Sequence, residues 1–64
     1  MDDDTDDLIA QLCTRIGMIM EDASVIALNV SGKVPSDRQT AIDELDGAAK
    51  RIEALIAAVR TLLA

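Results

Sequence analysis

The chain has 64 residues, half of them apolar, and a formal net charge of -6. A chain of this length holds one domain at most, whose core contributes only about 3–5 kcal/mol, while the apolar content is too high for an intrinsically disordered segment. Since Phe, Trp and Tyr are absent, the core must consist of Ile, Leu, Val, Met and Ala, as is typical of helical bundles.

Acidic residues are concentrated at the beginning of the chain. Five of the twelve are Asp2, Asp3, Asp4, Asp6 and Asp7. Such a run can be a binding tail, or it can occupy a helix N-terminus, where carboxylates meet unpaired N–H groups and the positive end of the helix dipole. We favour the helix terminus because the run leads directly into an apolar repeat.

The first predicted helix spans residues 5–30. Apolar side chains recur there at spacings of three and four, the pattern of a heptad seam, at Ile9, Leu12, Ile16, Ile19, Ala23, Ile26 and Val30. A second stripe lies one position further round the helix and consists of Cys13, Met20 and Ala27. The apolar surface is therefore wider than the seam of a two-stranded coiled coil.

Three further apolar residues, Met18, Val25 and Leu28, fit neither stripe. Two explanations stay open for them. They are covered by Val30 and Val34 of the turn or are ordinary scattered surface residues. Alternatively, they form a patch for a protein partner, in which Met18 supplies an adaptable contact.

Residues 31–35 form the predicted turn. We expect Gly32 to take the left-handed conformation that closes a helix, and Pro35 disfavours helix at the residue before it. Ser36 and Gln39 have the spacing of a capping box, which predicts that a second helix begins at residue 36.

The second predicted helix spans residues 36–63 and repeats the pattern of the first. Its seam consists of Ala41, Leu45, Ala48, Ile52, Leu55, Val59 and Leu62, and its second stripe of Ile42, Ala49, Ile56 and Leu63. Asp46 and Lys50 stand four residues apart with the acid first, which favours an ion pair on an exposed face.

Two helices of about 37 Å joined by a short turn predict an all-α antiparallel hairpin that forms a single domain over residues 1–64. A lone hairpin covers the seam and leaves the second stripe of each helix in water. Pairing of two hairpins into a twofold four-helix bundle would cover both stripes. The expected homodimer interface is Leu8, Cys13, Met20, Ala27, Ile42, Ala49, Ile56 and Leu63.

The residues for catalysis are missing. There is no His or Tyr, and the single thiol, Cys13, falls in an apolar stripe, so it is expected to be a buried small hydrophobe and no nucleophile. The acidic run lacks the spaced ligands and the glycine of a calcium loop, and no glycine-rich phosphate loop occurs. We therefore expect no catalytic residue, no cofactor and no metal, and we predict that the protein is not an enzyme.

The remaining features bear on partners and location. The six basic residues are spread along the chain, which makes nucleic acid an unexpected partner. No apolar run approaches the roughly 20 residues of a membrane span, and one cysteine without a signal sequence indicates the cytoplasm. The leading hypothesis is a small cytoplasmic protein–protein interaction module, acting as an adaptor, inhibitor or regulatory subunit. The alternatives are a nucleic-acid-binding regulator whose face, with Lys50 and Arg51, forms on dimerisation, or a structural subunit of a larger complex.

Overall fold

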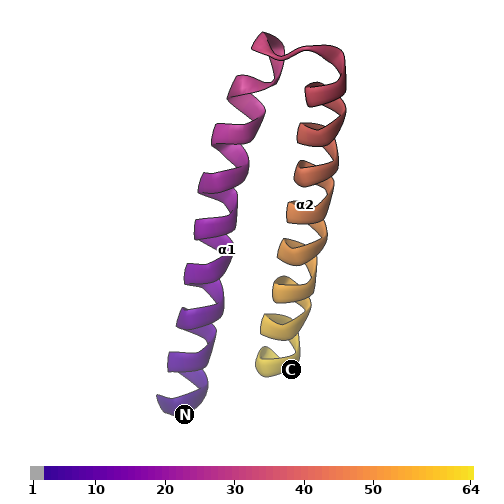
Figure 1. The fold of residues 1–64 in the computed structure, drawn as a ribbon. Helices are drawn as coiled ribbons and strands as arrows, with labels where there is room; N and C mark the ends of the chain where they lie inside the picture. The colour runs from indigo at the N-terminus through magenta and orange to yellow at the C-terminus, as the bar shows by residue number, and fades with distance from the viewer. Residues whose placement is uncertain (1–2) are drawn as a thin grey trace.

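A computed structural model describes residues 3–64 and shows two long helices lying side by side, joined by a turn at one end (Figure 1). Helix α1 spans Asp3–Asn29, the 3-10 turn η1 spans Val30–Gly32, and helix α2 spans Pro35–Leu63. The molecule measures 51 × 15 × 10 Å. The predicted all-α antiparallel hairpin is therefore confirmed. Neither helix in the described residues is both long enough and apolar enough to span a membrane.

Helix α1 begins at Asp3, two residues earlier than expected. Asp4, Asp6 and Asp7 consequently lie in its first turns, where carboxylates are favoured by the unpaired N–H groups and the helix dipole. Asp2 of the same acidic run lies outside the described residues.

The end of α1 differs from the expectation for Gly32. No residue between 3 and 64 has a positive φ, so the prediction of a left-handed glycine is wrong. Instead the chain tightens into the 3-10 turn, and the N–H of Lys33 donates to the carbonyl of Val30 at 3.1 Å. A turn of this kind satisfies terminal carbonyls of a helix without a left-handed residue.

The start of α2 also differs, because the predicted capping box does not form. Val34 takes the N-cap position in an extended conformation, and no side chain caps the helix there. Pro35 occupies the first helical position, where its missing N–H costs nothing and its fixed φ suits a helix. Gln39 donates to Asp43 Oδ1 at 3.1 Å rather than reaching back to Ser36.

The seam lies between the two helices as predicted. All fourteen predicted seam residues are buried or half-buried, whereas nearly every other side chain of residues 4–64 is exposed. The two exceptions, Thr5 and Lys33, stand four residues before Ile9 and three after Val30, so each extends the repeat by one step. The period of three and four therefore governs the whole hairpin.

The core between the helices is thin. Only Ala41 and Ala48 are buried, each with 4% of its surface exposed, and no large side chain of the described residues is fully buried. The radius of gyration is 15.1 Å, against about 11 Å for a compact domain of this length. A single hairpin thus covers its seam only in part and supplies little hydrophobic stabilisation.

Candidate interaction surface

The hairpin has two broad faces, one on each side of the seam. On one of them, side chains of both helices line three shallow grooves. The middle groove includes Asp22 of α1 together with Glu44 and Arg51 of α2, and the third includes Arg15 and again Arg51. We call this side the grooved face.

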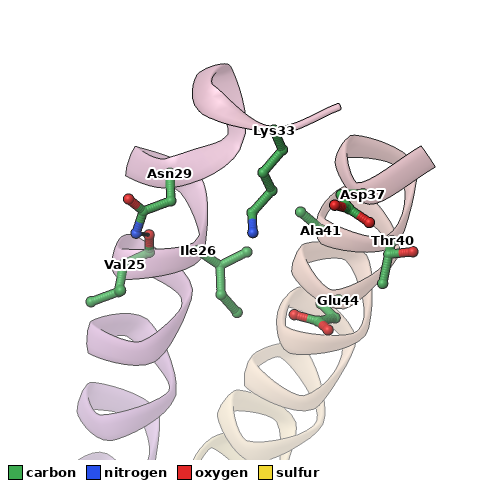
Figure 2. A pocket seen from close by; sticks show the side chains of 8 residues that line it. All are labelled: Val25, Ile26, Asn29, Lys33, Asp37, Thr40, Ala41 and Glu44. Atoms are coloured by element: carbon green, nitrogen blue, oxygen red, sulfur yellow. Dashed lines mark hydrogen bonds between the residues drawn. The ribbon is translucent and has the colours of Figure 1, made fainter. Parts of the chain in front are cut away.

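The groove nearest the turn, of about 240 Å³, also belongs to the grooved face. Figure 2 shows Lys33 extending from the turn into the space between the helices, above Ile26 and Ala41. Its half-buried position is typical of a lysine whose methylene groups cover apolar neighbours. Asp37 and Glu44 line the α2 side of the same groove.

The second stripes of α1 and α2 meet on the opposite face. Since successive helical residues are about 100° apart, residues directly after a seam position fall on one flank of the seam. Residues that border the grooves, such as Asp22 and Arg51, fall on the other flank. Because the flanks that border the grooves lie on the same side of the hairpin in α1 and α2, the flanks that carry the second stripes lie together on the opposite side. We call this side the apolar face. It consists of Cys13, Met20, Ala27, Ile42, Ala49, Ile56 and Leu63.

All seven residues of the apolar face are exposed in the single hairpin. The exposed fractions are 52% for Met20, 49% for Ile42 and 70% for Leu63. Cys13 is exposed as well, so the expectation of a buried thiol is not met within one chain. No covering element within residues 3–64 lies over this face, because the hairpin consists of two helices and their turn.

Leu8 lies apart from the other predicted interface residues. It precedes the seam residue Ile9, and it stands seven and fourteen residues before Arg15 and Asp22. Since seven residues complete nearly two helical turns, Leu8 shares the grooved flank with these two residues. We therefore leave it out of the apolar face, although it is 44% exposed.

Met18, Val25 and Leu28 form a third apolar area on the outer side of α1, and Val25 also borders the groove nearest the turn. All three are exposed, and Leu28 reaches 79%. Val30 joins the seam, and Val34 is itself exposed. The explanation that these two turn residues cover the patch is therefore wrong. Ordinary scattered surface residues and a partner site both remain as interpretations.

The surface area of the hairpin also shows how much of the chain is left uncovered. The chain exposes 4845 Å², whereas a folded monomer of 6.8 kDa is expected to expose about 3,950 Å². The excess of about 900 Å² per chain reflects helices that each have one neighbour and a wide apolar stripe.

Charged groups on the outer side of α2 interact only weakly with each other. Lys50 Nζ and Asp46 Oδ2 lie 2.9 Å apart, and both side chains are mostly exposed, which confirms the predicted pair. The hydrogen bond and the charge of Asp46 raise the pKa of Lys50 above its ordinary value. A pair in open solvent adds little to stability.

The described residues hold no group of three or more His, Cys, Asp or Glu side chains arranged to bind a metal ion. Cys13 lies on the apolar face, away from the acidic side chains that line the grooves. The candidate functional feature is therefore the apolar face. Comparisons with protein families, with curated proteins and with solved structures found no match to this chain.

Sequence reasoning missed two features of this surface. The half-buried positions of Thr5 and Lys33 were not predicted because both residues are polar, although their spacing from Ile9 and Val30 was the available signal. It also did not recognise that the two second stripes share one face. The available signal was the heptad position. In both helices the second stripe directly follows the second seam residue of each heptad, and in an antiparallel pair of helices these positions lie on the same side of the seam.

Proposed function

We propose that the protein is a small cytoplasmic protein–protein interaction module that works as a homodimer of helical hairpins. The observation that carries the proposal is the apolar face, whose large side chains stay in water in the single chain. Leaving such side chains exposed forgoes about 1.5–3 kcal/mol for each one that a partner would bury completely. A second copy of the chain presents the same face and supplies a cover of matching length.

The area available for burial fits a stable dimer. Two separate hairpins expose about 9,700 Å² together, whereas one compact protein of twice the mass exposes about 6,600 Å². The difference of about 3,100 Å² lies within the range of obligate homodimers and well above that of crystal-packing contacts. Helices in the resulting four-helix bundle each have two neighbours, which a wide apolar stripe requires.

The proposal is tested by the molar mass of the wild-type chain in solution. Light scattering behind a sizing column should give twice the chain mass at micromolar concentration, and the melting temperature should rise with protein concentration, because folding and association are linked. A single-chain mass together with a melting temperature that does not depend on concentration would refute the homodimer.

The role of the bundle as a module for other proteins is tested at the outer patch. Met18 and Val25 point away from the apolar face, so the double variant M18D/V25D should keep the dimer mass and the helical content of the wild type. We expect it to lose protein partners that the wild type captures from the native host. The matched control is Q11D/T14D, which adds two charges at exposed positions on the outer side of α1, nearer its N-terminus. Identical partner sets for all three proteins would remove this patch as a site.

The surroundings of Lys50 and Arg51 weigh against a nucleic-acid-binding role. Lys50 is paired with Asp46, and Arg51 lines a groove together with Asp22 and Glu44. A phosphate backbone approaching either base would therefore meet carboxylates, which weakens the electrostatic attraction that such binding requires. Titration of structured RNA at low salt should show no binding tighter than about 10⁻⁴ M, the nonspecific range.

A further inference from the structure

We infer that the two hairpins dock through their apolar faces with a twofold axis parallel to the helices, so that both turns lie at the same end of the bundle. The inference rests on the proposed homodimer and adds its geometry. It follows from the register of the two helices and from the sizes of the side chains that this register brings level with each other.

The residues that line common grooves give the register. Asn29 and Ala41 line the groove at the turn, Ala23 and Gly47 line the middle groove, and Ile19 and Arg51 line the third. From one pair to the next, six residues along α1 match six along α2, and then four match four. In an antiparallel pair, each step along α1 toward the turn matches one step back along α2. The apolar face therefore has three complete levels, separated by about 10 Å, which pair Ala27 with Ile42, Met20 with Ala49, and Cys13 with Ile56.

Each level combines one large and one small side chain. The large one belongs to α2 at the level nearest the turn, to α1 in the middle, and to α2 again at the third level. Large and small residues thus alternate along each helix as well as across the hairpin. Interfaces and cores pack to high density when large side chains of one surface meet small ones of the other.

A twofold axis parallel to the helices keeps every level in place and sets α1 against α2 of the second copy. Met20 then meets the partner's Ala49, Ile42 meets the partner's Ala27, and Ile56 meets the partner's Cys13. All three levels match large on small. Neighbouring helices also run antiparallel throughout the bundle, as in up-down four-helix bundles.

A twofold axis perpendicular to the helices reverses the order of the levels and sets each helix against its own copy. At full overlap, Met20 meets the partner's Met20 and Ala49 meets the partner's Ala49, which leaves one crowded and one empty contact. Sliding the hairpins by one level in one direction sets Ile42 against the partner's Leu63. Sliding them by one level in the other direction brings Ile56 to the partner's turn, where α2 begins at Pro35, and leaves Leu63 beyond the end of the partner. Overpacked and empty sites both cost stability.

The parallel arrangement has a consequence for the outer surface. Met18, Val25 and Leu28 belong to the half of α1 nearer the turn. With both turns at one end, the two copies of this patch lie in the same half of the bundle, on its opposite sides. The dimer thus presents two equivalent apolar patches at one level.

The geometry is tested by the distance between spin labels in the dimer. The label is attached at Ser31→Cys in the turn, in a Cys13→Ala background that keeps a small side chain at that level. Ser31 is exposed, so labelling should not disturb the fold. Because the hairpin is 51 Å long, turns at the same end place the labels within about 35 Å across a bundle of helices 8–10 Å apart, and turns at opposite ends place them about 50 Å apart.

A control label at Glu21→Cys sits level with Met20, near the middle of the apolar face, at an exposed position on the outer side of α1. It should give a distance well below about 50 Å in either arrangement, and it shows that a dimer is present. A Ser31→Cys distance below about 35 Å supports the inference. A distance near 50 Å with an intact dimer overturns the docking geometry and leaves the homodimer standing. No measurable distance for either label, together with a single-chain mass, overturns the homodimer as well.

Discussion

Ile56→Asp is the substitution that most directly couples the apolar face to folding. Ile56 is 36% exposed in the hairpin, so about a third of the roughly 1.5–3 kcal/mol available from burying an isoleucine is still to be gained on docking. An aspartate at this position loses that gain and would place a carboxylate in an apolar interface. The effective cost of such burial is several kcal/mol per ion.

In the proposed homodimer, twofold symmetry doubles the effect, because each substitution occurs twice in one interface. A combined loss of at least about 4 kcal/mol raises the dissociation constant by at least about 10³. The separated hairpin then has to fold on a core in which only Ala41 and Ala48 are buried. We therefore expect the variant to lose its dimer mass and its helical circular dichroism together at micromolar concentration.

Ala57→Asp is the matched control. It adds the same charge one residue along α2, at an exposed position that lies about 100° further from the seam. This variant should keep the mass and the helical content of the wild type. An Ile56→Asp variant that melts cooperatively as a monomer would show that the hairpin needs no partner. A variant that stays a dimer of unchanged affinity would remove Ile56 from the interface.

Two further predictions concern the seam and the ion pair. Ala48→Leu should lower the free energy of unfolding by about 1–3 kcal/mol in urea titrations, because a larger side chain at this buried seam position has to push the two helices apart, whereas Ala57→Leu on the outer surface should not. Equal stabilities would contradict the close approach of the helices at Ala48. Asp46 raises the pKa of Lys50 above its ordinary 10.5, so the contribution of the pair to stability is complete below this pH and is lost as the pH rises through the raised value. Any excess in melting temperature of the wild type over Lys50→Gln at pH 8 should thus vanish by pH 12, and an excess that grows with pH would contradict the pairing.

The sequence by itself determined the two helices and the residues between them. The spacing of Ile9, Leu12 and Ile16 repeats with little interruption, and in a helix this spacing allows only one face to be apolar enough to meet a neighbour. The turn length then leaves an antiparallel return as the compact solution. For the same reason the second stripes could be read as residues that a lone hairpin leaves exposed.

The details of the turn could not be read in this way. Gly32 and Ser36 carry the local signals of a left-handed helix end and a capping box, yet the chain uses a 3-10 turn and begins α2 at Pro35. Several local solutions satisfy the terminal N–H and carbonyl groups at similar free energy. The choice among them depends on the chain path that brings the two seams into contact. Local sequence signals carry no information on that path.

Only the tertiary structure decided which residues share a face and at what level. Met20 and Ala49 are 29 positions apart in the sequence, and their common level depends on the register of α1 against α2, which the helical period leaves undetermined. That register is set by packing of the seam, where the small Ala48 lies near Ala23 in the middle groove. A helical repeat describes directions around one axis, and the offset between two axes arises only when their side chains interlock.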